Sequence, residues 1–253
     1  KPYAERVRFV GDQVAVVVAE TEDIAAEALG LIDVEYEDLP VVTDVLEAMK
    51  DDAILLHPEN ENNTICQFRI RKGDVDEAFS NADVIIEGEY LTPVQEHAFL
   101  QPEAGVAYID DAGRVTVEAA GQWVHDERKQ IAHALGLPEE QIRVIHPAIG
   151  GAFGGREDLS VQIVLALAAW RLPQRGIHRP VKIIWSREES MIGHHKRHEY
   201  LIRTRWGASK EGQILGAEVE VIANGGAYNY TSNKVLGNAT LMCTGPYEIS
   251  NVK

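Results

Sequence analysis

The first fifty residues arrange their apolar and polar positions in short runs. β-Branched residues dominate residues 7–10 and 14–19, and the Gly-Asp dipeptide between these two runs is typical of a hairpin turn. Thr21 can cap a helix that carries two acidic residues in its first turn. Residues 32–36 have the pattern of a third strand. The pattern therefore predicts a β-β-α-β unit that ends near residue 50.

Strand-like and helix-like patterns are mixed along the rest of the chain. Strands are predicted at 84–90, 106–109, 115–119, 142–145, 181–185, 201–206 and 217–223, and helices at 126–135, 159–170 and after the capping box at 186–189. The helix at 159–170 is apolar at nearly every position, and the strand at 181–185 is also apolar, so we expect both to be buried. Because strands and helices do not alternate strictly, the predicted class is α+β.

A polar stretch at residues 51–64, with His-Pro and Asn-Asn dipeptides, is typical of a connector. We therefore expect a first domain at residues 1–50 and a second domain at residues 65–253. The chain begins without Met and stops in a strand-like segment at Lys253. We interpret it as an internal piece of a longer protein, with the second domain incomplete at its C-terminus.

Charge and cysteine content narrow the function classes. The 253 residues include 24 Lys and Arg against 40 Asp and Glu, a formal charge of −16, which argues against nucleic-acid or anionic-membrane partners. The longest apolar run, residues 163–170, is far shorter than the ~20 residues of a membrane span. The only cysteines, Cys66 and Cys243, form neither a disulfide framework nor a Cys-x-x-Cys site. We expect a reducing, cytoplasmic compartment.

The segment 150–155 holds four glycines in six positions, just before the predicted helix at 159–170. Backbone N–H groups there could bind an anion at the helix N-terminus. Arg156 stands near the place where a phosphate-binding P-loop needs Lys, and Ala152 interrupts a dinucleotide pattern, so neither fingerprint fits. A tight turn remains an equal alternative. Glu157 could either complement the helix dipole or hydrogen-bond a polar substrate.

Three histidines, His194, His195 and His198, suggest a metal site. A zinc-protease motif would place Glu after the first histidine, whereas Lys196 and Arg197 lie between the last two here and would oppose a cation. We therefore do not expect these three histidines to bind a metal. A Gly-x-Ser-x-Gly hydrolase motif is also absent from the sequence.

Three motifs in order resemble the molybdenum-binding large subunit of the xanthine dehydrogenase and aldehyde oxidase family: Gln95–Glu103, Gly121–Trp123 and Gly150–Glu157. Residues 8–15 are similar to the later half of the family's hammerhead domain, and 186–189 and 246–251 also agree. The resemblance covers essentially the whole chain. It implies the end of an a/b hammerhead domain followed by a mixed α+β molybdenum-cofactor-binding domain.

The resemblance also implies roles for individual residues. Gln122 matches the glutamine that hydrogen-bonds the apical oxygen ligand of molybdenum. Cofactor contacts are implied for four residues of the glycine loop: Gly151, Phe153, Gly154 and Gly155. Glu157 matches the glutamate that positions the heterocycle in purine-oxidising members. The general base and an Arg-Gly-Phe-Gly segment of the family would lie beyond Lys253, in a further C-terminal cofactor domain.

The implied function is oxidation of a purine-like N-heteroaromatic substrate, with water as the oxygen source and molybdenum-molybdopterin as the cofactor. One alternative is an aldehyde substrate, and another is a non-catalytic module that binds a small molecule or a partner. The pterin could carry a cytosine dinucleotide. FAD and [2Fe-2S] clusters would belong to partner domains or subunits, and the assembled enzyme would be a dimer. Alone, residues 1–253 are expected to be inactive.

Overall fold

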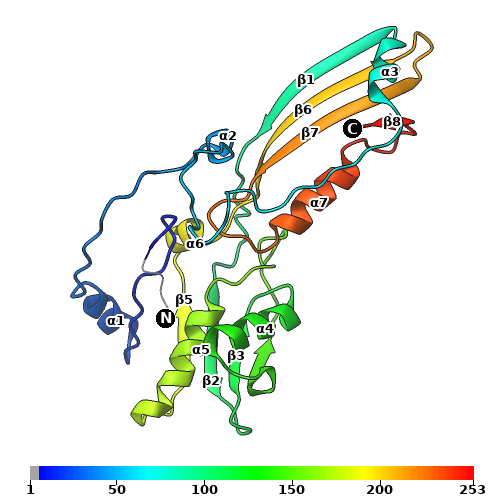
Figure 1. Cartoon of the computed structure of the whole chain (residues 1–253). Helices are drawn as coiled ribbons and strands as arrows, with labels where there is room; N and C mark the ends of the chain where they lie inside the picture. Colours follow the sequence, from blue (N-terminus) through cyan, green and yellow to red (C-terminus); the bar gives the residue numbers. More distant parts are fainter. Residues whose placement is uncertain (1–5) are drawn as a thin grey trace. The chain divides into compact units, whose positions relative to one another are not determined.

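The computed structural model describes residues 6–253 (Figure 1). Backbone proximity divides the chain into two units that each combine distant segments. Among the described residues, the first unit comprises 6–38 and Glu96–Lys196, and the second comprises Leu39–Gln95 and Arg197–Lys253. The sequence-based domain limits, 1–50, 51–64 and 65–253, stay a prediction.

The first unit contains a mixed four-stranded sheet in the order β4-β3-β2-β5. Its strands are β2 (Ala104–Ile109), β3 (Val115–Ala119), β4 (Ile142–Ile145) and β5 (Val181–Ile184). β2 and β3, which contain the strands predicted at 106–109 and 115–119, form an antiparallel hairpin, whereas β4 runs parallel to β3. The strand at 181–185 was expected to be buried, but β5 lies at the sheet edge and Ile184 is 58 % exposed. Side chains alternate between the two faces of a strand, so Val181 and Ile183 pack against the core whereas Lys182 and Ile184 project from the other face and are exposed.

The core of the first unit lies between one face of this sheet and two helices, α4 (Val124–Leu135) and α5 (Gln162–Arg171). Val117, Ile131 and Leu165, one from each element, are at most 1 % exposed. As predicted, α4 ends at Gly136 in the left-handed conformation, with φ of 67°. The shorter helices of this unit are α1 (Glu22–Leu29), η1 (Glu139–Gln141), η2 (Pro173–Arg175) and α6 (Arg187–Gly193). The capping box that starts α6 is confirmed.

Helix α5 begins at Gln162 rather than at residue 159, which corrects the expected position of the glycine loop. Two local hydrogen bonds between side chains and the backbone form just before the helix. The Asp158 carboxylate accepts from the Leu159 N–H, and the Gln162 amide oxygen accepts from the Ser160 N–H. Such bonds compete with helical backbone pairing. The loop therefore does not lie at the helix N-terminus, and Glu157 is not in a first helical turn.

The N-terminal β-β-α-β prediction was right only for its helix. Thr21 caps α1 through a hydrogen bond that its hydroxyl accepts from the Ile24 N–H at 3.3 Å. None of the segments 7–10, 14–19 and 32–36 forms a strand with any described residue. A strand requires a second strand to satisfy its backbone groups, which alternation alone does not supply.

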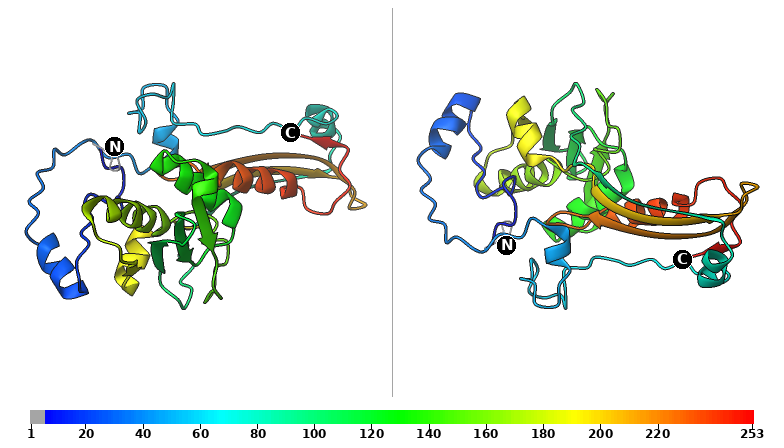
Figure 2. Two further views of the ribbon diagram at one scale, coloured as in Figure 1. Left: turned by 90° about the horizontal axis from the view of Figure 1, so that it is seen from below. Right: turned by 90° about the horizontal axis from the view of Figure 1, so that it is seen from above.

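The second unit contains a four-stranded sheet in the order β1-β6-β7-β8. Its strands are β1 (Val84–Thr92), β6 (Glu199–Ala208), β7 (Ile214–Asn224) and β8 (Asn251–Val252). The strands predicted at 201–206 and 217–223 are confirmed within β6 and β7, which pair as an antiparallel hairpin. Its turn closes where the Gly212 N–H donates to the Ser209 carbonyl. Three helices here were not predicted: α2 (Val45–Ala48), α3 (Val75–Ser80) and α7 (Ser232–Met242). Helix α7 runs along the sheet (Figures 1 and 2).

Together the two units confirm the predicted α+β class, because each combines helices with a sheet of mixed strand direction. Among residues 6–253, no helix combines the length and the apolar character that crossing a bilayer requires.

Candidate functional site

The glycine loop, residues 150–155, holds an unusual backbone in the first unit. Gly151 and Gly154 have φ of 107° and 82°, which favour glycine. Phe153 also has a positive φ, of 53°, and its side chain is 75 % exposed. A strained backbone and an exposed aromatic ring at one residue both cost free energy. Such combinations cluster at binding sites, where a ligand covers the side chain.

The buried side chain of Arg156 holds this loop through hydrogen bonds to backbone carbonyls. The side chain is 3 % exposed, and its Nε donates to the Gly151 carbonyl at 3.0 Å. The same guanidinium donates to the Gln101 carbonyl and lies 3.9 Å from the centre of the Phe99 ring. Burial lowers the pKa of Arg156, and the nearby Glu103 carboxylate opposes that shift. The sequence reasoning used Arg156 only to reject a P-loop and missed this role.

Gln122 lies against the end of the loop through two hydrogen bonds. Its backbone N–H donates to the Arg156 carbonyl at 2.8 Å, and its side-chain oxygen accepts from the Arg156 N–H at 3.1 Å. These two bonds fix the amide orientation. The side-chain NH₂ group donates to none of the described residues, and Gln122 is exposed. A neutral donor is thus held ready beside the glycine loop.

A buried contact between a carboxylate and an imidazole supports the segment that carries Gln122. Glu127 of α4 is fully buried, and its carboxylate lies 3.0 Å from Nε2 of His146, which follows β4. Burial raises the pKa of Glu127, whereas His146 acts in the opposite direction. A Cβ at Gly121 would collide with the Glu127 carboxylate, so only glycine fits beside the pair. Sequence reasoning missed this pair because its members lie in separate elements.

Glu157 is half-buried, and its carboxylate forms no hydrogen bond or ion pair with any residue from 6 to 253. Its neighbour Asp158 is used locally, as an acceptor for the Leu159 N–H at 2.8 Å. Burial raises the pKa of Asp158. Of the two acids, Glu157 is therefore the one whose carboxylate is available to a ligand.

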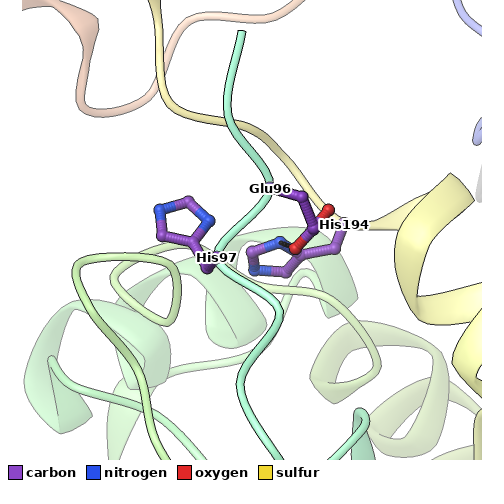
Figure 3. A group of neighbouring side chains, drawn as sticks. All are labelled: Glu96, His97 and His194. Carbon is purple, nitrogen blue, oxygen red and sulfur yellow. Dashed lines mark ion pairs between the residues drawn. The ribbon is translucent and has the colours of Figure 1, made fainter.

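A cluster of polar side chains packs against Gly155 of the loop, and Figure 3 shows three of its members, Glu96, His97 and His194. His194 is 4 % exposed and bonds to the Gly155 carbonyl through Nε2. His97 meets it edge to face, and His195 stacks on it with ring centres 4.3 Å apart. Burial, followed by the charge of His194, lowers the pKa of His195 to about 3. Glu96 completes the cluster, with its carboxylate 3.8 Å from Nδ1 of His194.

His194, His195 and His198, which were weighed as a metal site on sequence alone, do not form a group of potential metal ligands. His198 belongs to the second unit, where its Nε2 lies 2.8 Å from the Ser232 hydroxyl. Glu96 and His97 join His194 instead. The sequence reasoning missed this grouping because His97 and His194 lie far apart in the chain. Its only local signal was the Glu-His dipeptide inside the motif 95–103.

Two family models match the chain. Residues 56–253 match the molybdopterin cofactor-binding domain. Residues 3–40 match the a/b hammerhead domain of aldehyde oxidase and xanthine dehydrogenase. The first match contains Gln122, the glycine loop and the cluster around His194, so all the geometry described above lies in the matched region.

Curated relatives extend the match to nearly all of the chain. The nicotinate dehydrogenase large molybdopterin subunit of Eubacterium barkeri is 37 % identical over 249 residues, which are 98 % of this chain and 57 % of that protein. A probable xanthine dehydrogenase subunit of Bacillus subtilis (strain 168) is 38 % identical over 98 % of this chain and 32 % of that protein. The chain thus spans only part of each relative.

Solved structures agree with these matches. Aldehyde oxidoreductase from Desulfovibrio gigas superposes with a TM-score of 0.86 at 26 % identity, over 92 % of this chain and 25 % of that one. Quinoline 2-oxidoreductase from Pseudomonas putida 86 gives a TM-score of 0.82 at 27 % identity, over 99 % of this chain and 32 % of that one. The observed fold is therefore that of a known group of oxidoreductases.

Proposed function

Because this chain belongs to the xanthine dehydrogenase and aldehyde oxidase family of molybdopterin-binding large subunits, we propose that it forms part of a molybdenum hydroxylase active site. When bound, the molybdenum cofactor supplies the two-electron oxidation of a substrate carbon, with water as the oxygen source. The residues of this chain contribute binding, orientation and hydrogen bonding around it.

The glycine loop and Gln122 fit such a cofactor. The amide oxygen of Gln122 is held by the Arg156 N–H, so its NH₂ group is the part that faces a ligand. A neutral donor can hydrogen-bond an oxygen atom of the cofactor without changing the charge of the site. Backbone groups of Gly151 and Gly154 can approach the pterin closely, and the exposed Phe153 ring would be covered by it. Gly155 is buried, and its N–H and carbonyl already bond to Ala152 and His194, so its proposed cofactor contact lacks this support.

Glu157 is proposed to bind the substrate. Its carboxylate makes no bond to residues 6–253, so it can accept a hydrogen bond from an N–H group of a heteroaromatic ring. This unused carboxylate beside the glycine loop is the observation that carries the substrate proposal. The names of relatives support a heteroaromatic substrate, since they include a nicotinate dehydrogenase and a probable xanthine dehydrogenase.

An aldehyde is the second candidate substrate. The observation in its favour is the superposition on aldehyde oxidoreductase from Desulfovibrio gigas, with a TM-score of 0.86. An aldehyde has no N–H group to donate, so Glu157 would have no direct partner on such a substrate. Removal of the Glu157 carboxylate should therefore lower turnover of a heteroaromatic substrate and leave turnover of an aldehyde largely unchanged.

Electron transfer out of the site is proposed to use FAD and [2Fe-2S] clusters on other domains or subunits of a dimeric enzyme. The chain has two cysteines, fewer than the four that such a cluster usually takes from a protein. Both curated relatives are named as single subunits of their enzymes, which supports the presence of partners. A cytosine dinucleotide form of the pterin and a cytoplasmic location remain parts of this proposal.

The test compares Glu157→Gln with Glu188→Gln, a control at an exposed glutamate of α6, in the enzyme purified with its cofactors and partners. Molybdenum content is measured first, followed by kcat/KM for hypoxanthine, which carries ring N–H groups, and for benzaldehyde, which carries none. We expect Glu157→Gln to retain molybdenum and to lose about 10²-fold in heteroaromatic turnover, as removal of one transition-state interaction does. Unchanged heteroaromatic kinetics would refute the role of Glu157. Turnover of benzaldehyde alone by the unmodified enzyme would favour the second candidate.

A further inference from the structure

We propose that Glu96, His97 and His194 form a binding site for a divalent transition-metal ion such as Zn²⁺, behind the glycine loop. Each residue offers one ligand atom, and the three atoms lie within 4.8 Å of one another (Figure 3). Carboxylate and imidazole are ligand types that zinc uses in proteins. This set differs from the group of His194, His195 and His198 that the sequence argues against, because only His194 belongs to both.

The hydrogen bonding of His194 defines which nitrogen faces the site. Its Nε2 bonds to the Gly155 carbonyl, and a carbonyl can only accept, so Nε2 carries the proton. In a neutral ring, Nδ1 then has a free lone pair. Nδ1 is buried without a hydrogen-bond partner, in a side chain that is 2 % exposed. Histidines that bind metals typically donate their other ring N–H to a carbonyl or carboxylate in this way.

Nδ1 of His194 faces an acceptor, one oxygen of the Glu96 carboxylate, at 3.8 Å. Nδ1 of His97 is also buried without a hydrogen-bond partner. A buried nitrogen lone pair that faces a carboxylate is costly unless a cation or a proton lies between them. The competing explanation for this cluster is a second proton on the His194 ring instead of a metal ion. The ring lies between two carboxylates, with Nδ1 3.8 Å from Glu96 and Nε2 3.9 Å from Glu103. The experiment below separates the two.

The geometry needs only a local adjustment. Tetrahedral zinc with bonds of 2.0–2.1 Å brings its ligand atoms to roughly 3.3 Å from one another. The atoms of this cluster, now up to 4.8 Å apart, must therefore move inward. Glu96 and His97 lie outside any helix or ladder of β1–β8, so rotation of their side chains does not disturb regular structure. Three protein ligands leave a fourth position for water.

Lys196 is the group that opposes the ion. Its ammonium lies 2.7 Å from one oxygen of the Glu96 carboxylate and also donates to the His194 carbonyl. A metal ion would compete with this ammonium for Glu96, and the two charges would repel. The Lys196 side chain is 28 % exposed, so it can turn toward solvent. Removal of its charge should therefore strengthen metal binding.

A bound ion would tie the segment at residues 96–97 to His194 and, through the Gly155 carbonyl, to the glycine loop. Gly155 packs directly on the site, because a Cβ there would lie 2.8 Å from His97 and 2.9 Å from His194. The ion would thus restrict movement of the glycine loop. This inference concerns this chain's own side chains and holds whether or not the assigned substrate is right.

The test uses the purified protein with the partners it carries, dialysed against a chelator and titrated calorimetrically with Zn²⁺. Co²⁺ serves as a second probe, because its visible spectrum reports coordination. We expect one ion per chain and a tetrahedral Co²⁺ spectrum. His97→Ala should weaken binding by roughly 100-fold or more, because it removes a direct ligand and loss of an outer-shell partner alone costs about 10–100-fold. His125→Ala, at an exposed histidine of α4, is the matched control.

Lys196→Met provides a second test that does not remove a ligand. The loss of the competing ammonium should increase the affinity for Zn²⁺ by roughly tenfold, because a positive charge beside the site repels the ion and holds the Glu96 carboxylate. The proposal is overturned by the absence of stoichiometric binding, by unchanged affinity in His97→Ala, or by unchanged affinity in Lys196→Met. Any of these results would leave a proton on His194 as the explanation for the cluster.

Discussion

Replacement of Arg156 should release the glycine loop while leaving the sheet of the first unit intact. The guanidinium donates to two backbone carbonyls, those of Gly151 and Gln101, and lies over the Phe99 ring. Hydrogen bonds from a charged donor contribute about 1.5–3 kcal/mol each. Arg156→Met removes both bonds and leaves the Glu103 carboxylate, which is 1 % exposed, without the nearby positive charge.

The expected magnitude follows from this loss. Removal of one partner from a buried charged pair costs about 3–5 kcal/mol, a range that overlaps the sum of the two lost hydrogen bonds. Because the contributions are not additive, we expect a loss of about 3 kcal/mol or more in the free energy that keeps the loop closed. Arg156→Lys keeps the charge but not the planar fork, so it should fall between Arg156→Met and the unmodified protein.

Hydrogen exchange of two amides measures this loss directly. The Gln122 N–H donates to the Arg156 carbonyl, and the Gly155 N–H donates to the Ala152 carbonyl. A loss of about 3 kcal/mol should accelerate exchange at both amides by roughly 10²-fold. Arg143→Met, at an exposed position of β4, is the control and should leave both rates unchanged. If Arg156→Met left both rates within about threefold of the unmodified protein, the anchoring role of Arg156 would be refuted.

Two further predictions concern stability. Leu165→Ala should lower the free energy of unfolding by about 2–5 kcal/mol, because Leu165 is 1 % exposed in the core of the first unit. Urea unfolding of the purified protein measures this loss, with Leu241→Ala at a 73 % exposed position as the control. A loss equal to that of the control would contradict the assigned core. Hydrogen bonds from Arg114, its backbone N–H first, lower the pKa of Asp110 from 3.8 to about 2. The contribution of this carboxylate to stability should therefore be complete above pH 3.8 and fall away as the pH drops through about 2. Asp110→Asn should thus destabilise the protein at pH 6 but hardly at pH 2, and an equal loss at both values would refute the assignment.

The local pattern of apolar and polar residues was enough to predict the limits of some strands. β3 and β4 have the predicted limits, because alternating apolar residues and a clear turn mark them. The same reasoning failed at residues 7–10, 14–19 and 32–36, where strand-like alternation lacks a pairing strand among the described residues. Helix α7 was missed because Thr231 provides no side-chain cap and Gly237 weakens the helical pattern.

The candidate site shows the same limit. Gln122 and the glycine loop could be proposed from their motifs, and their assigned roles stay predictions. Arg156, the Glu127–His146 pair and the cluster of Glu96, His97 and His194 depend on contacts between distant segments. Desolvation and charge pairing act on such contacts, and neither leaves a periodic trace in the sequence.

The central claim is that Gln122 and the glycine loop hold a molybdenum cofactor. The most direct test is the electron paramagnetic resonance spectrum of Mo(V) in the purified enzyme that carries Gln122→Ala, compared with Gln141→Ala at an exposed control position. The account predicts that molybdenum is retained, that the Gln122→Ala spectrum and turnover change, and that the control matches the unmodified enzyme. An unmodified enzyme without molybdenum, or an unchanged spectrum and rate in Gln122→Ala, would contradict it.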